Sequence, residues 1–159
     1  VLLEAVAETP RKTVVFCPYV AGCAMLAEEL RSVGYTTEII TGSVSGAKRT
    51  QILHDFQNAQ APHVLVCHPQ TVGFGTELSA ADTMIFSVPM LLGVFVYNQS
   101  LERLSSVKQK TQNINIIHIL GCKAEHKALN NLIAVYSEGK NIAAVFEHFT
   151  SYLISYIIY

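Results

Sequence analysis

Residues 63–67 read His-Val-Leu-Val-Cys, and this unbroken apolar run decides the fold class. Strands of a parallel sheet are buried on both faces, so they lack the polar alternation of half-exposed strands. Outward from this run, other short β-rich runs occur at 13–17 (TVVFC), 36–40 (TTEII), 83–86 (TMIF) and 114–120 (INIIHIL). Helical spacing of apolar residues occurs at 20–33, from 45 through 56, and at 94–107 and 123–137. This alternation predicts an α/β domain, a parallel sheet flanked by helices with right-handed crossovers.

Glycine and serine mark the expected helix ends. Gly34 is placed to end the first helix in a left-handed conformation, and Gly139 to close the last one. Ser45 is placed to cap the helix that turns Ile52, Leu53 and Phe56 toward the core.

The loops at the carboxyl ends of parallel strands carry function in such sheets. Here they are Pro18-Tyr19, Thr41–Ser43 and Gln70–Glu77, which we expect along one edge.

Composition indicates one folded domain without a global charge signal. The chain has 159 residues, of which 50% are apolar and 14% charged, and its net charge is -1. Such a chain can form a core and is not disordered. Because no global basic charge is present, any nucleic-acid contact must come from a local patch or from backbone amides.

The four cysteines contain no C-x-x-C pair, and three fall in or beside apolar runs. This placement favours reduced, buried thiols in a reducing compartment. The chain lacks a signal-peptide pattern, so we expect an intracellular, cytoplasmic fragment of a longer protein. Cys122 and His126 alone do not make a zinc site, and no G-x-S-x-G elbow is present.

The last nineteen residues differ from the rest. Apolar residues recur at helical spacing from Ile142 to Ile157, which predicts an amphipathic helix over 141–159 that packs on the domain of 1–140 or on a missing domain. A membrane-surface helix is the alternative, which the absence of Lys or Arg after Lys140 disfavours.

Four motifs follow one another in a recognisable order. A Gly42-Ser43 turn precedes Arg49 and Phe56. The loop Thr71-Val-Gly-Phe-Gly-Thr-Glu-Leu78 leads to Ala81-Asp-Thr-Met-Ile85, and Gln99-Ser-Leu-Glu-Arg103 opens the last motif. Over about residues 11–121 this order resembles the second RecA-like lobe of superfamily-two helicases and Swi/Snf-type DNA translocases.

The resemblance implies an ATP cofactor with Mg²⁺, held mainly by a missing N-terminal RecA-like lobe. That lobe would supply the phosphate loop, since no G-x-x-x-x-G-K-[ST] occurs here. It implies that Arg103 is an arginine finger on the γ-phosphate and that Gln99, Gly75 and Glu77 face nucleotide.

The resemblance also implies contacts to a DNA backbone, with RNA left open. Backbone N–H groups and hydroxyls grip phosphates without reading sequence, and the residues in that position are Gly42, Ser43, Thr71, Val72 and Gly73. The simpler interpretation of Gly42, Gly73 and Gly75 is that they are turns with positive φ.

The last motif departs from the family. Glu102 and Lys108 replace glycines, and Ser106 replaces the second arginine. Three hypotheses follow: a motor half completed by the missing lobe, a degenerate lobe that binds nucleic acid or a partner without ATP turnover, and an unrelated α/β domain for a nucleotide-linked ligand. The isolated fragment is expected to have no ATPase activity.

Overall fold

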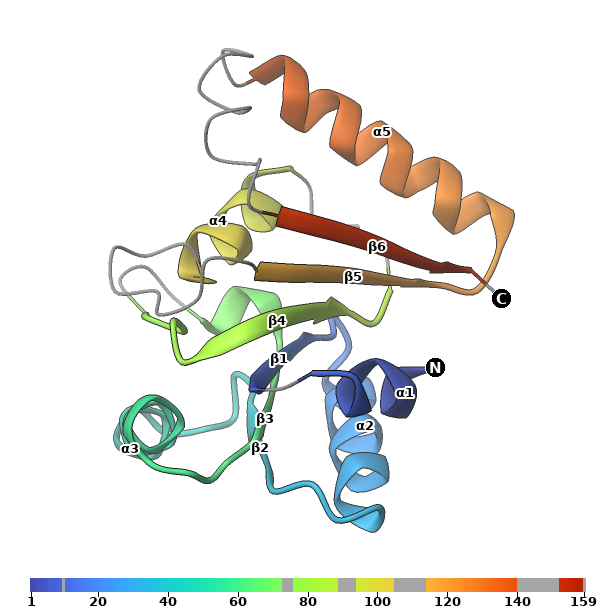
Figure 1. The fold of residues 1–159 in the computed structure, drawn as a ribbon. Helices are drawn as coiled ribbons and strands as arrows, with labels where there is room; N and C mark the ends of the chain where they lie inside the picture. Colours follow the sequence, from blue (N-terminus) through green and yellow to red (C-terminus); the bar gives the residue numbers. More distant parts are fainter. Residues whose placement is uncertain (10, 73–75, 89–93, 105–113, 140–151, 159) are drawn as a thin grey trace.

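Six parallel strands form one sheet at the centre of the domain (Figure 1). The computed structural model describes residues 1–9, 11–72, 76–88, 94–104, 114–139 and 152–158. The order across the sheet is β2-β3-β1-β4-β5-β6. The strands are β1 (Lys12–Phe16), β2 (Thr37–Ile40), β3 (Val64–Cys67), β4 (Ala81–Phe86), β5 (Ile114–Leu120) and β6 (Tyr152–Ile158). The predicted parallel α/β architecture is confirmed.

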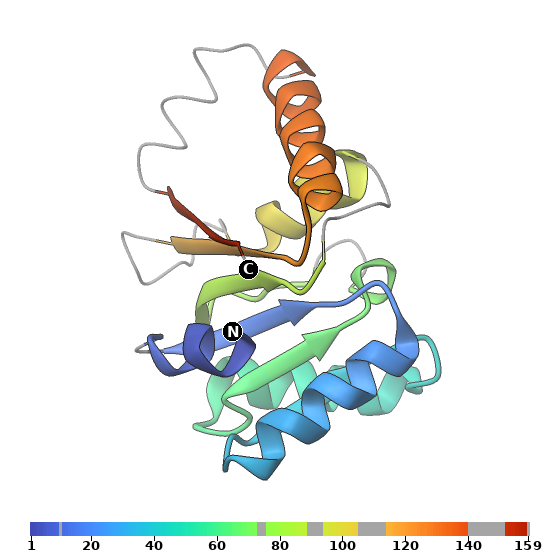
Figure 2. The same cartoon turned by 90° about the vertical axis from the view of Figure 1, so that its right-hand side faces the viewer.

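Helices cover both faces of this sheet, as Figures 1 and 2 show. One face packs against α1 (Leu2–Ala7) and α2 (Val20–Ser32), whose buried residues form one apolar cluster with the sheet. The other face packs against α3 (Gly46–Asn58), α4 (Val94–Leu104) and α5 (Lys123–Gly139) in a second cluster. A single 3₁₀ turn, η1 (Pro69–Thr71), follows β3.

The predicted helix ends agree with the structure where it describes them. Gly34 follows α2 with φ +98°, the left-handed conformation that favours glycine. Ser45 Oγ accepts a hydrogen bond from the Lys48 amide at 3.3 Å, as a helix N-cap does. The helix expected over 94–107 is confirmed as far as Leu104, and 105–107 lie outside the described residues.

The carboxyl-terminal tail differs from its predicted structure. A helix was expected over 141–159, but residues 152–158 form β6, which pairs with β5 from Ile114↔Tyr152 to Leu120↔Ile158. The physical reason is composition, since isoleucine and tyrosine suit a pleated strand, and β5 offers an edge whose backbone groups need partners. Residues 140–151 and 159 lie outside the described part, and a domain boundary at 140 stays a prediction.

Lys12 ties the start of β1 to the end of α3. Its Nζ donates to the carbonyl oxygens of Phe56 and Ala59, both at 2.6 Å, and lies 5.0 Å from the centroid of the Phe56 ring. The last carbonyls of a helix lack partners within the helix, so an ammonium group there both satisfies them and complements the helix dipole. Partial burial lowers the pKa of Lys12.

Arg31 performs a similar task at the edge strand β2. Thr36 O accepts from Val64 N of β3, so the carbonyl of Thr37 points to the opposite side, away from the sheet. Arg31 Nε and Nη2 donate to that carbonyl at 3.0 and 2.6 Å. One outward-facing acceptor of β2 is thereby occupied by a side chain of the same domain.

Candidate functional site

The loops after β2 and β3 are bound to each other at the carboxyl edge of the sheet. Thr71 Oγ1 donates to either of two carbonyls in reach, Ile40 O at 3.0 Å and His68 O at 2.7 Å. The His68 amide also donates to Ile40 O, at 2.9 Å. Ile40 ends β2 and His68 follows β3, so these bonds place Thr71 beside the Thr41–Ser43 turn, as the topology predicted.

The Thr41–Ser43 turn presents polar groups at this edge. The hydroxyls of Thr41 and Ser43 lie 2.9 Å apart, and Gly42 and Ser43 are both exposed. Gly42 does not adopt a left-handed conformation, so the interpretation that it needs a positive φ is wrong. A Cβ atom at position 42 would meet nothing within 4 Å, which means that the sheet does not demand glycine there.

Two other predicted residues of this edge differ in accessibility. Val72 is 9% exposed and packs its side chain in the apolar cluster beneath α3 and α4, so this side chain is not available to a phosphate. Gly73 and Gly75 lie outside the described residues.

A second group forms where α4 ends. The Leu78 amide donates to the carbonyl of Arg103 at 3.1 Å, which joins the end of the Gln70–Glu77 loop to the last turn of α4. Glu77 is half-buried and accepts from the Ser79 hydroxyl at 2.7 Å. Gln99 and Arg103 are four residues apart on α4 and both half-buried, so they share one helical face. The structure therefore brings Arg103 to the loop that carries Glu77.

A buried polar pair that the sequence did not reveal lies between α4 and β5. The Tyr97 hydroxyl and His118 Nε2 are 3.1 Å apart, and the two residues are 2% and 0% exposed. Phe86 stacks on the His118 ring, with centroids 4.8 Å apart and planes at 11°. This cluster joins β4 and β5 to α4, so it fixes the helix that carries Gln99 and Arg103. A histidine inside the apolar run 114–120 was the only sequence signal.

The burial of His118 predicts acid sensitivity. Desolvation lowers its pKa to about 4, against about 6.5 in an unfolded chain. The unfolded chain binds the extra proton first, so this stabilisation is complete above pH 6.5 and is lost as the pH falls through 4. The free energy of unfolding should fall by roughly 3 kcal/mol over that window.

Urea unfolding of the 159-residue chain at several pH values measures this fall. His118→Gln should remove the part of the pH dependence of unfolding that His118 contributes. His54→Gln, at a histidine whose side chain is 67% exposed, is the matched control and should leave the pH profile as in the wild type. Equal slopes for wild type and His118→Gln would contradict the prediction.

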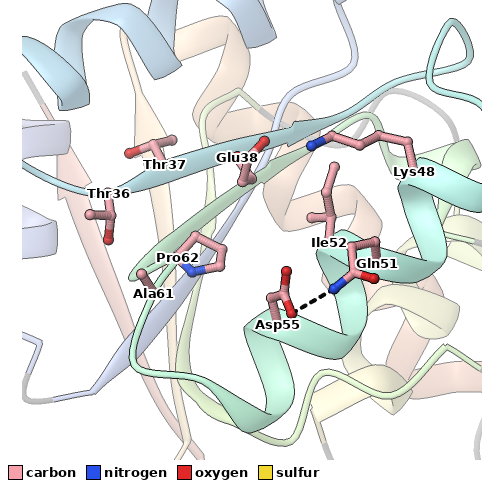
Figure 3. A pocket seen from close by; sticks show the side chains of 9 residues that line it. All are labelled: Thr36, Thr37, Glu38, Lys48, Gln51, Ile52, Asp55, Ala61 and Pro62. Atoms are coloured by element: carbon pink, nitrogen blue, oxygen red, sulfur yellow. Dashed lines mark hydrogen bonds between the residues drawn. The ribbon is translucent and has the colours of Figure 1, made fainter.

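A separate cavity of about 310 Å³ lies between the edge strand β2 and α3 (Figure 3). Charges of both signs line it, Lys48 against Glu38 and Asp55, and Gln51 Nε2 donates to Asp55 Oδ1 at 2.9 Å. Its remaining lining residues are Thr36, Thr37, Ile52, Ala61 and Pro62. None of the predicted site residues lines this cavity, so it is distinct from the two groups above.

The described residues contain neither a metal-binding cluster nor a membrane-spanning helix. Among the residues that the structure describes, no group of three or more His, Cys, Asp or Glu is placed to hold a metal ion. Within the same ranges, the helices are too short or too polar to cross a bilayer. The four cysteines are free thiols, and three of them, Cys17, Cys23 and Cys67, are buried as expected.

Comparison with solved structures identifies the fold. The C-terminal part of the Fun30 ATPase domain superposes with a TM-score of 0.72 at 19% identity, over 82% of this chain and 43% of that one. The C-terminal domain of S. cerevisiae Dbp5, in a complex with Gle1 and IP6, gives a TM-score of 0.63 at 16% identity, over 98% and 79%. The RecA-like lobe that the sequence predicted is confirmed.

Sequence comparison identifies the family. A putative SWI/SNF-related matrix-associated actin-dependent regulator of chromatin, subfamily A member 3-like 1, from Arabidopsis thaliana is 26% identical over 145 residues. The match covers 89% of this chain but only 16% of that relative. The family described as helicase conserved C-terminal domain matches residues 1–121, most of the chain. The chain therefore belongs to the helicase C-terminal domain family, and its predicted resemblance to superfamily-two, Swi/Snf-type members is confirmed.

Proposed function

We propose that this domain is the second lobe of an ATP-dependent nucleic-acid translocase or helicase. It closes on ATP and Mg²⁺ held mainly by an N-terminal RecA-like lobe, and it grips a nucleic-acid backbone. The observation that carries the proposal is the Leu78–Arg103 hydrogen bond of 3.1 Å, because it fastens α4 to the loop of Glu77. This bond joins the segments that carry Arg103, Gln99 and Glu77, and the proposal assigns these three residues to a nucleotide presented by another lobe.

The carboxyl edge supports the nucleic-acid part of the proposal. The exposed Gly42 and Ser43 lie beside Thr71, and this edge offers small residues, hydroxyls and backbone amides. Such groups contact phosphates without reading bases, as a protein that moves along a strand requires. DNA is the proposed partner because the Arabidopsis relative is described as a chromatin regulator. An intracellular, nucleic-acid-associated location is part of the same proposal.

Of the two alternative functions, one is wrong and the other remains a candidate. The unrelated α/β domain for a nucleotide-linked ligand is wrong, because the chain belongs to the helicase family. A degenerate lobe that binds without ATP turnover remains the second candidate. It is favoured by Ser106 at the position of the second motif arginine and by Glu102 at the position of a glycine.

ATP hydrolysis by the two-lobed parent protein distinguishes these candidates. We expect the parent to hydrolyse ATP faster when duplex DNA is added, and the isolated 159-residue chain to show no turnover, because it has no G-x-x-x-x-G-K-[ST] loop. A parent that binds DNA but does not hydrolyse ATP would establish the degenerate lobe. Turnover by the isolated chain would contradict the division of labour between lobes.

A further inference from the structure

Two buried cysteines lie close together at the turn from β1 into α2. Cys17 directly follows β1, and Cys23 lies in the first turn of α2. Cys23 Sγ donates to the carbonyl of Cys17 at 3.4 Å, and Cys17 Sγ donates to the carbonyl of Tyr19 at 3.5 Å. The two cysteines are 3% and 0% exposed. The chain between them therefore folds around the Cys17 sulfur.

Gly22 makes room for that sulfur. A Cβ atom at position 22 would lie 2.6 Å from Cys17 Sγ, a distance that real Cβ contacts do not show. Its φ is not in the left-handed region, so a turn does not require glycine here. Space for the Cys17 sulfur is the constraint that the structure shows at this position.

The groups around Cys17 stabilise its thiolate. When Cys17 ionises, a hydrogen bond from the Cys23 thiol to its sulfur is the largest cause that lowers the pKa of Cys17, to about 6, and a hydrogen bond from Ser87 and the charge of His68 act in the same direction. Burial opposes this shift but does not outweigh it. The pKa of Cys23 is raised, first by its bond to Cys17 and then by burial. Cys17 is thus the nucleophile, and Cys23 is the thiol that keeps its proton.

We propose that Cys17 and Cys23 form a redox-modification site that hydrogen peroxide oxidises to a disulfide. The Cys17 thiolate attacks one peroxide oxygen, the O–O bond breaks, and a sulfenic acid and hydroxide form. The Cys23 sulfur then attacks the sulfenic sulfur and displaces its hydroxide, while the Cys23 proton and one proton from solvent convert the two hydroxides to water. Overall, two thiols lose two electrons and hydrogen peroxide becomes two molecules of water.

The product would clamp β1 to α2 at the carboxyl edge of the sheet. The Cys17 amide donates to the carbonyl of Cys67 at 3.0 Å, so the clamp also involves the end of β3, which leads to Thr71. Because Cys17 is 3% exposed, a small oxidant suits the site better than a bulky reagent. The site needs no second lobe, so it stands independently of the function proposed above.

Peptide mass spectrometry of the folded 159-residue chain after hydrogen peroxide tests the proposal. Trypsin cleaves after Lys12 and Arg31, so Cys17 and Cys23 leave together in the peptide Thr13–Arg31. Digestion under non-reducing conditions should give that peptide lighter by roughly 2 Da, the mass of the two hydrogens lost in forming one disulfide. The reaction rate should rise with pH through a midpoint near 6 and level off above it, as the Cys17 thiolate fraction does.

Variants separate the two roles. Cys23→Ser should stop at the sulfenic acid of Cys17 or its higher oxides, whereas Cys17→Ser should leave Cys23 as a thiol. Cys67→Ser removes another buried cysteine and should leave the disulfide intact. If a variant does not fold, the wild-type peptide still decides. Oxidation at the exposed Cys122 with Thr13–Arg31 unchanged would overturn the proposal.

Discussion

Arg103→Ala in the two-lobed parent protein is expected to lower the kcat for ATP hydrolysis by roughly 10³-fold or more, as removal of an arginine finger does. Charge spreads over the phosphoryl oxygens in the transition state, and a planar guanidinium with fixed donors stabilises it more than the ground state. The KM for ATP should change much less than kcat. The Leu78–Arg103 bond uses the backbone carbonyl, so the substitution leaves that junction in place.

Steady-state ATPase assays with saturating DNA measure this effect. Glu102→Ala is the matched control, because Glu102 is the exposed neighbour on the same turn of α4 and should retain activity within a few fold. Arg103→Lys keeps the charge but loses the planar fork, so it should not restore the rate. If Arg103→Ala behaves like Glu102→Ala, Arg103 is a surface arginine and the assignment of the last motif is wrong.

Phe86→Ala should lower the free energy of unfolding of the 159-residue chain by about 4 kcal/mol, within the range for a buried phenylalanine. Phe86 is 1% exposed at the end of β4. Its ring stacks on Phe16 at 5.6 Å and on His118 at 4.8 Å, and lies 5.2 Å from the ring of Tyr97. Truncation would remove three ring contacts at once and leave a cavity between two strands and α4.

Urea denaturation at neutral pH measures this change in the free energy of unfolding. A typical domain has a free energy of unfolding of only about 5–15 kcal/mol, so the expected loss is a large part of that total. Phe86→Leu fills most of the space and should cost about 1 kcal/mol. Tyr19→Ala, at an aromatic that is 56% exposed, should change stability by less than about 0.5 kcal/mol. A loss below 1 kcal/mol for Phe86→Ala would mean that α4 collapses into the space.

Most of the sheet was predictable because its strands are short apolar runs between turn residues. The 114–120 run is bounded as β5 is, and the four residues Val64–Cys67 are all buried as a parallel strand requires. The proximity of Ser43 and Thr71 followed from the topology alone, since the carboxyl ends of neighbouring parallel strands meet at one edge.

What sequence reasoning missed has physical causes as well. The helix α1 has only six residues, too few to show a period. In the tail, apolar residues are so dense that helical and strand spacings both fit, and pairing with β5 decides between them. Tyr97 and His118 lie 21 positions apart in the sequence and in different elements, so no local pattern predicts their contact. The roles of Arg103, Gln99 and Glu77 remain predictions until the assays above are done.

The bond between Arg31 and the Thr37 carbonyl has a consequence for the lobe as a separate molecule. An open strand edge recruits strands from other chains and seeds aggregates. The carbonyls of β2 that point outward are those of Thr37 and Ile39. The next one along the chain, the Thr41 carbonyl just beyond β2, accepts a hydrogen bond from the Val44 amide at 3.1 Å. A strand from another chain therefore cannot form a continuous row of hydrogen bonds with this edge, because the Thr37 and Thr41 carbonyls already have partners. This side of the sheet is therefore a poor template for polymerisation when the 159-residue chain is made as a separate molecule.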